Sequence, residues 1–208
     1  MQESERLTLY WCLNRFYSYP SGKYWPAPSV LHCSTLFKEA IESLGLTIGG
    51  EFLALFNHVD LHELQIEYTR LFVSSLRGVP AKPYASYYLD HKKEVMGEST
   101  LWVREFYHSF ALSAEGENHE PPDHIATELG FIASLIAEEL NALWNKNQEQ
   151  KEFIQREEER FLKEHWLKWA GIFFACVSQN AQNLFYQTIG RISAELHKFE
   201  SQRLKERV

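Results

Sequence analysis

The sequence predicts an all-α protein, a compact bundle of roughly nine to eleven helices in a single domain. Three observations carry this prediction. Apolar residues recur every three or four positions through most of the 208-residue chain, which is the period of an amphipathic helix. No segment shows the polar–apolar alternation typical of a half-buried strand. Hydrophobic residues make up 45% of the chain, enough for one sizeable core.

The first two expected helices lie in the N-terminal quarter. Leu7–Tyr17 carries one apolar face and is followed by Pro20, which cannot continue a helix. A second helix is expected to begin behind Ser34 as its N-cap and to end at Gly45.

A third helix is expected behind Asp60, which begins a capping-box pattern, and its apolar stripe continues to Phe72. Residues 74–98 then lose the helical period and contain several glycines and prolines. We therefore expect a long loop there, and loops of this length are often functional.

The second half of the chain carries the clearest helical signals. Ser99 is the expected cap of the helix that follows the loop, and an acidic linker follows that helix at residues 114–122. Further helices are expected over residues 125–143, 148–162, 166–177 and 181–199. The stretch over residues 166–177 is apolar on nearly all sides, which indicates a central buried helix.

Charge and cysteine usage exclude several classes of function. The net charge is −7 and the isoelectric point is near 5.7, whereas nucleic-acid binding needs a basic surface. Cys12, Cys33 and Cys176 are far apart, so neither a disulfide framework nor a structural zinc site is expected. No phosphate-binding glycine motif occurs. We therefore expect no cofactor, no metal and no nucleic-acid partner.

The sequence also predicts a cytoplasmic protein with no stable membrane insertion. The N-terminal apolar stretch is interrupted by Asn14 and Arg15 and lacks a small-residue cleavage site, so it does not fit an export signal. Every apolar run is shorter than the roughly 18 residues that a membrane-spanning helix requires.

The segment Glu120-Pro121-Pro122-Asp123-His124 is the most informative part of the chain. The two prolines end whatever precedes them. Asp123 then stands where a helix N-cap belongs, which would place His124 in the first helical turn. The segment is either a well-made helix start or a docking site. Catalysis by an Asp-His dyad is disfavoured, because neighbouring helical side chains diverge by about 100° and no nucleophile-elbow motif occurs.

Two other features invite a functional interpretation. His58 and His62 are four residues apart, but Asp60 between them reads as a cap, so a shared metal is disfavoured. In the loop, prolines and tyrosines lie close together, among them Tyr84 and Tyr87. They either build a preformed apolar groove for a peptide or pack the loop onto the core.

Taken together in chain order, several segments resemble the twin-arginine redox-enzyme maturation chaperones, the TorD/DmsD family with its NarJ-like relatives. The segments that carry the resemblance are Glu67-Tyr68-Thr69-Arg70-Leu71-Phe72-Val73, Gly78-Val79-Pro80, Pro83-Tyr84-Ala85-Ser86-Tyr87-Tyr88-Leu89-Asp90, Val95-Met96-Gly97-Glu98-Ser99-Thr100-Leu101 and Glu120-Pro121-Pro122-Asp123-His124-Ile125, followed by Glu128-Leu129.

The resemblance implies a non-enzymatic, all-α chaperone. Such a protein binds the twin-arginine signal peptide of a molybdenum-cofactor oxidoreductase, of the DMSO or TMAO reductase type, in the cytoplasm before export. It also implies a hinge near residues 114–123, between helical parts 1–113 and 124–208, and either a monomer or a dimer that exchanges C-terminal helices. An alternative is a NarJ-like assembly factor, which binds the N-terminus of a non-exported nitrate reductase-type subunit.

The resemblance also implies a set of binding residues. Positions implicated in signal-peptide binding in the family correspond here to Tyr68, Leu71, Phe72, Leu76, Gly97, Pro121, Asp123 and His124. The DmsD branch typically has other residues, aromatic ones, at two of these positions, whereas this chain has Tyr68 and Leu76 there. The resemblance therefore leaves the branch and the client open.

These residues suggest how a twin-arginine leader would be held. Leu71, Phe72, Leu76 and the loop tyrosines Tyr84 and Tyr87 would receive its apolar stretch through hydrophobic burial. Carboxylates would receive its guanidinium groups, since the forked donors of arginine suit them; the candidates are Asp123, Glu120, Glu115 and Glu117. His124, if protonated, would weaken arginine binding.

Overall fold

The computed structural model describes residues 2–21, 27–47, 60–76, 78–91, 95–110 and 120–206, with side chains from residue 34 onward in the second range. Its N-terminal helices are α1 (Gln2–Tyr17), α2 (Ala27–Ser43), α4 (Leu61–Tyr68), α5 (Ala85–Leu89) and α6 (Glu98–His108). The C-terminal helices are α7 (Ile125–Trp144), α8 (Gln148–Phe161), α9 (Leu167–Asn180) and α10 (Leu184–Glu206).

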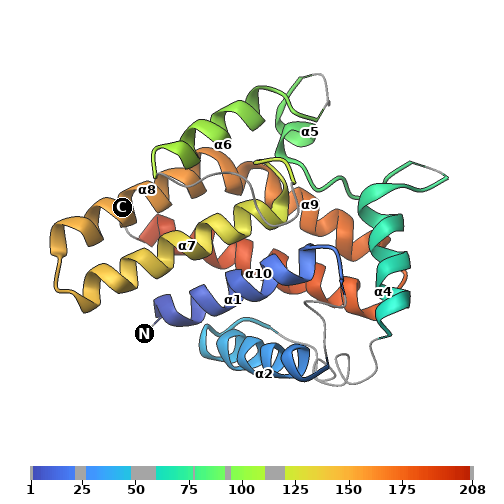
Figure 1. Ribbon diagram of the computed structural model, residues 1–208, viewed down its shortest axis with the longest axis horizontal. Helices are drawn as coiled ribbons and strands as arrows, with labels where there is room; N and C mark the ends of the chain where they lie inside the picture. The colour runs from blue at the N-terminus through green and yellow to red at the C-terminus, as the bar shows by residue number, and fades with distance from the viewer. Residues whose placement is uncertain are drawn as a thin grey trace.

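Within the described ranges the chain forms helices and one isolated β-bridge, which confirms the all-α prediction. Figure 1 shows α1, α7 and α10 at the centre, α6 along one edge and α2 along the opposite edge. The turn between α7 and α8 lies at one end of the bundle, and α4 lies at the other. None of the described helices combines the length and apolarity needed to cross a membrane.

Two helices continue into π-helical turns that the sequence analysis did not anticipate. The segment η1 (Thr69–Val73) extends α4, and η2 (Leu162–Trp166) joins α8 to α9. The wider turn of η1 is closed by the hydrogen bond from Ser74 N to Thr69 O at 2.8 Å. Such turns are rare and frequently occur at functional sites.

Aromatic side chains fill the core where α1, η1, α9 and α10 meet. Tyr17 of α1 stacks on Phe174 of α9, with ring centroids 5.7 Å apart. Phe72 of η1 packs edge-on against Tyr186 of α10 at 5.4 Å. These rings are fully or almost fully buried. Because large aromatic residues bury the most apolar area, the packing of Phe72 against Tyr186 ties the segment 67–73 to the centre of the bundle.

Several predicted helix ends are confirmed. Asp60 caps α4, with its Oδ1 accepting from Glu63 N at 3.0 Å. Gly45 follows α2 with φ +68°, and Leu46 N bonds to Ile41 O at 3.0 Å. That bond belongs to a motif that requires a left-handed residue, which favours glycine.

Other expectations about the helices were wrong. Ser34 lies inside α2 and is buried, because α2 begins earlier than the apolar pattern indicated. The expected loop over residues 74–98 contains the short helix α5. Ser99 is in the first turn of α6, whose N-cap is Gly97. The stretch over residues 166–177 is not buried on all sides, since Ile172 is 56% exposed.

A buried ionic cluster joins α1, α8 and α10. Arg6 is fully buried and pairs with Glu200 at 2.7 Å and with Glu158. Arg203 pairs with the same two carboxylates, at 2.6 and 2.9 Å. Buried charges are tolerated when they are paired and hydrogen-bonded. The cluster therefore fixes the N-terminal helix against the C-terminal helices.

We expect Arg6→Ala to lower the free energy of unfolding by about 3–5 kcal/mol, because two buried carboxylates lose a partner. Lys198→Ala is the control, since Lys198 pairs with Glu195 at the surface and such pairs contribute about 0–1 kcal/mol. Urea unfolding measures both changes. Equal, small losses in the two variants would show that the Arg6 cluster does not hold the helices together.

Candidate functional site

The Glu-Pro-Pro-Asp-His segment is joined to the loop that precedes α5. Tyr84 and His124 form an antiparallel β-bridge. Ile125 N donates to Pro83 O at 2.8 Å, and Ala85 N donates to Asp123 O at 2.9 Å. His124 N also donates to Pro121 O at 3.0 Å, which makes a tight turn after the two prolines. Two motifs that are distant in the sequence therefore form one unit.

Asp123 is not the N-cap of α7, which corrects the sequence prediction. Its Oδ2 instead accepts hydrogen bonds from Ser86 N at 2.9 Å and from Ser86 Oγ at 2.6 Å. Asp123 is 0% exposed. It therefore caps α5, a helix that the sequence analysis missed, and a cap supplied from a remote segment leaves no local signal.

His124 is the actual N-cap of α7. Its Nδ1 accepts from Ala126 N at 3.2 Å, so the ring is neutral and carries its proton on Nε2. Burial lowers the pKa of His124 to about 3, because the charged form would lose its hydration. The suggested weakening of arginine binding by protonated His124 therefore has no role near neutral pH.

Glu120 is the accessible carboxylate of this segment. It is half-buried, and burial raises its pKa. The Tyr84 hydroxyl lies close enough to affect the pKa of Glu120. Tyr68 lies close enough for the Glu120 charge to add to the effect of burial in raising the pKa of Tyr68. In the part of the chain that the structure describes, Glu120 forms no ion pair with lysine or arginine.

Three of the predicted binding residues are in the core. Tyr68 is 3% exposed, Leu71 0% and Phe72 4%. Tyr68 donates to Tyr17 O at 3.3 Å, and its ring contacts Tyr19 edge-on at 5.4 Å. In this conformation these side chains are packed beneath the surface of α4 and η1, and a peptide bound at that surface does not contact them.

The outward face of the same segment is apolar and exposed. Ile66 is 56% exposed and Val73 is 59% exposed, and Leu76 just beyond η1 is fully exposed. Of the predicted set, only Leu76 belongs to this face. The sequence analysis missed Ile66 and Val73, although their helical spacing from the buried positions could have indicated the opposite face.

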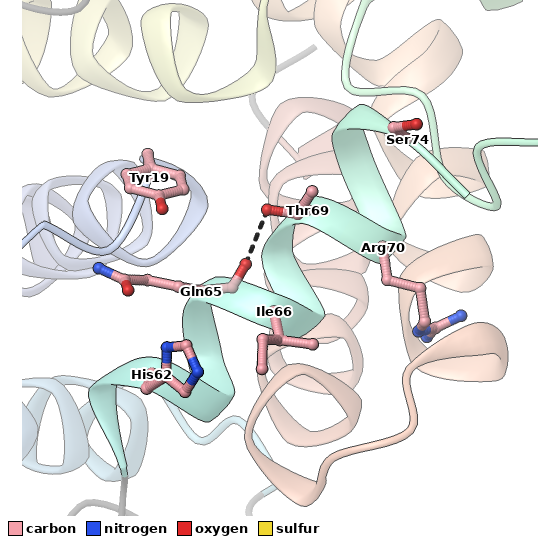
Figure 2. Close-up of a pocket in the computed structure, with 7 residues that line it drawn as sticks. All are labelled: Tyr19, His62, Gln65, Ile66, Thr69, Arg70 and Ser74. Carbon is pink, nitrogen blue, oxygen red and sulfur yellow. Dashed lines mark hydrogen bonds between the residues drawn. The ribbon is translucent and has the colours of Figure 1, made fainter. Parts of the chain in front are cut away.

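An open groove of about 440 Å³ lies beside α4 and η1, and of the three exposed apolar side chains only Ile66 lines it. Figure 2 shows Tyr19 at the end of α1 facing α4 across it. The groove is lined by Tyr19, His62, Gln65, Ile66, Thr69, Arg70 and Ser74. Tyr19 contacts the buried Tyr68, whose pKa responds to the charge of Glu120; Glu120 itself is not among the lining residues. Tyr19, like Ile66 and Val73, lies outside the predicted set.

Arg70 does not add free positive charge to the groove. Its guanidinium binds both oxygens of Glu67, at 2.6 and 2.9 Å, and the carbonyl oxygen of Asn180 at 2.6 Å. Glu67 in turn accepts from Gln182 N at 2.5 Å. The pair therefore clamps the turn between α9 and α10, and Arg70 lines the groove while its guanidinium extends toward that turn (Figure 2).

The proline–tyrosine loop packs in part onto the core, and none of its prolines or tyrosines lines the groove beside α4 and η1. Tyr88 stacks on Trp169 at 5.6 Å, and Ala81 and Pro83 are buried, so the loop does pack onto the core. Tyr84 and Tyr87 stay partly exposed, and the Lys82 ammonium lies 4.4 Å from the Tyr87 ring centroid.

Gly97 supports the start of α6. A Cβ at this position would lie 2.0 Å from Asp90 Oδ2. Asp90 Oδ1 accepts from Ser99 Oγ at 2.5 Å, so the carboxylate is held in place and leaves room only for glycine. Pro121 is half-buried and supplies the carbonyl for the turn described above.

Some expectations lie outside the described residues, namely those for His58, Glu115 and Glu117 and for most of the predicted hinge at residues 114–123. Cys12 and Cys176 form no disulfide. Glu3, Glu139 and Glu158 bring carboxylate oxygens within 4.8 Å of one another, but the Arg6 guanidinium pairs with Glu3 and Glu158. A cation is therefore already present at this cluster.

Comparison with known proteins settles the family. The model of the family described as nitrate reductase delta subunit matches residues 33–175, which is more than half of the chain. The chain belongs to this family. The family's TorD and DmsD members are among its curated relatives, which confirms the resemblance in the motifs.

Two curated relatives and one solved structure define the likeness. The chaperone protein TorD of Aliivibrio salmonicida is 30% identical over 61% of this chain and 57% of its own length. The Tat proofreading chaperone DmsD of Salmonella typhimurium is 26% identical over 67% of this chain and 61% of its own. The chain thus spans less than two-thirds of these family members. A crystal structure from Archaeoglobus fulgidus, described as a candidate redox enzyme maturation protein, matches with a TM-score of 0.59, 26% identity and coverage of 95% and 94%.

The depressed pKa of His124 predicts an acid-sensitive fold. Because the folded state excludes the proton that the unfolded histidine binds, His124 contributes full stability above pH 6.5 and loses it as the pH falls toward 3. Relative to His124→Asn, the wild type should lose about 2 kcal/mol of unfolding free energy between pH 7.5 and pH 5.

The variant His124→Asn is a matched control, because asparagine is a good N-cap and does not titrate. Glu128 contributes in the opposite direction, since burial raises its pKa to about 7, but that contribution is common to both proteins and cancels in the difference. If the free energy of unfolding changed with pH in the same way in both proteins, the loss of stability could not be assigned to His124.

Proposed function

We propose that this family member is a cytoplasmic chaperone that binds the twin-arginine leader of a molybdenum-cofactor oxidoreductase, of the DMSO or TMAO reductase type, before export. The observation that carries the proposal is the open groove beside α4 and η1, together with Glu120, a half-buried carboxylate whose charge acts on the neighbouring Tyr68 and which has no ion-pair partner among the described residues. Thr69 and Arg70, from one of the motifs that resemble leader-binding chaperones, line this groove, and curated relatives are named as Tat proofreading chaperones.

The apolar stretch of the leader would lie on the exposed face of α4 and η1. Ile66, Val73 and Leu76 are the exposed apolar side chains there. Covering them removes apolar surface from water, at about 25 cal/mol per Å². Tyr68, Leu71 and Phe72 would then support this face from behind rather than contact the peptide.

The basic part of the leader would lie at Glu120. A guanidinium binds a carboxylate through paired hydrogen bonds and stacks on aromatic rings. Tyr84 and Tyr19 supply partly exposed rings near Glu120 and the groove. Asp60, the N-cap of α4, and Glu63, in its first turn, are exposed and add negative charge at the start of the helix that carries the lining residues His62, Gln65 and Ile66. Arg70 does not oppose a cationic peptide, because Glu67 neutralises it.

A NarJ-like assembly factor is the second candidate, favoured by the match to the nitrate reductase delta subunit model. Such a factor would use the same groove for the N-terminus of a subunit that is not exported. The neighbouring genes separate the two candidates. A nitrate reductase operon would favour the second, and a gene for an exported reductase would favour the first.

Calorimetry with leaders of molybdenum enzymes from the same genome tests the proposal. We expect a twin-arginine leader to bind, and an Arg-Arg→Lys-Lys leader to bind about tenfold more weakly, because lysine cannot form the bidentate pair. Glu120→Gln should bring the arginine leader down to the level of the lysine leader. If no leader from the genome binds the wild-type protein, the proposal is wrong.

The groove makes a separate prediction. Ile66→Asp should weaken leader binding about tenfold or more, because it places a charge where an apolar side chain is to be covered. Leu143→Asp is the matched control, since Ile66 is 56% exposed and Leu143 is 55% exposed, and Leu143 is on α7 next to the turn at the opposite end of the bundle (Figure 1). Equal affinities in the two variants would place the peptide elsewhere.

A further inference from the structure

We infer that Asp123 and His124 are positioning residues that hold Tyr84 against Glu120, and that the leader does not touch the Asp123 carboxylate. This inference rests on the proposed function and assigns these two residues a role different from direct contact with the leader's arginines. Three observations carry it: the bonds of Asp123, the packing of His124 and the partner of Tyr84.

Asp123 is bound entirely to the segment that carries Tyr84. Its carboxylate takes both hydrogen bonds of Ser86, and its main-chain oxygen takes the bond from Ala85 N. Both Asp123 and Ser86 are 0% exposed. A peptide on the outside would have to displace this segment before it could reach the carboxylate.

His124 fixes Tyr84 from the other side. The two residues pair as a β-bridge, and their rings meet edge-on with centroids 5.3 Å apart. The imidazole is itself held by Ala126 N at the start of α7. The backbone and the ring of Tyr84 are therefore both attached to the first turn of α7 and to the turn that precedes it.

The result is a tyrosine whose hydroxyl is presented to Glu120. Burial, with added repulsion from the charges of Glu120 and Asp123, raises the pKa of Tyr84 to about 12. The phenol thus stays protonated and remains a hydrogen-bond donor on the Glu120 side. A Tyr84 ring held in this way presents a fixed face beside the carboxylate, and a preorganised site loses less entropy when it binds a side chain.

The rival explanation is direct contact between Asp123 and a leader arginine. Asp123 Oδ1 has no hydrogen-bond partner among the described residues, so a guanidinium could bind it if the segment opened. The two explanations require different properties of the Asp123 side chain. Contact needs its negative charge, whereas positioning needs only an acceptor for the two Ser86 bonds.

The experiment compares Asp123→Asn, Asp123→Ala and Ser86→Ala by calorimetry with a twin-arginine leader and by amide hydrogen exchange at Ala85 and Ser86. Asparagine keeps an acceptor and removes the charge. We expect Asp123→Asn to bind within about twofold of the wild type, and Asp123→Ala and Ser86→Ala to lose about tenfold in affinity and in amide protection. The double variant Asp123→Ala/Ser86→Ala should lose no more leader affinity than Asp123→Ala alone, since both changes remove the same contact.

Two results would overturn the inference while leaving the proposed function intact. One is an Asp123→Asn variant that loses as much arginine-leader affinity as Asp123→Ala, which would show that the charge binds the leader. The other is normal amide protection at Ala85 and Ser86 in Asp123→Ala. Absence of leader binding by the wild-type protein would instead remove the proposed function and this inference with it.

Discussion

The contact between residues 83–86 and residues 121–125 is the constraint on which the candidate site depends. It joins the segment before α6 to the start of α7 through backbone bonds on both sides of Tyr84 and through the Asp123 carboxylate. The residues between these segments include the whole of α6, so the contact closes a long loop. Closing such a loop costs chain entropy, which dense hydrogen bonding in a buried setting offsets.

The residues of the candidate site fall into two groups. Tyr68, Leu71, Phe72, Asp123, His124 and Gly97 build the support, through burial, capping or the room they leave for a neighbour. Ile66, Val73, Leu76, Tyr19, Tyr84 and Glu120 face outward or are partly exposed. A substitution in the first group would change peptide binding indirectly, by displacing residues of the second group. Loss of binding in such a variant is therefore not enough to identify a contact residue.

Charge is distributed in a way that suits a cationic partner. The arginines of the ionic cluster and Arg70 are each bound by glutamates. Glu120 is left without a cation among the residues described, and Tyr84 and Tyr68 lie beside it. A carboxylate that is partly desolvated and unpaired is destabilised, as its raised pKa indicates, and a bound guanidinium would relieve this.

The sequence by itself determined the helical class, most helix positions, the Asp60 and Gly45 helix ends and the family, because periodicity, capping and motif order are local properties. It did not determine which carboxylate caps which helix. Asp123 was assigned to the adjacent helix, whereas its partner Ser86 is 37 residues away. It also did not show that Ile66 of α4 and Val73 of η1 face outward while Phe72 of η1 faces inward. Only the tertiary structure decided these points, because burial and long-range hydrogen bonds depend on which elements pack together, and no local pattern records that.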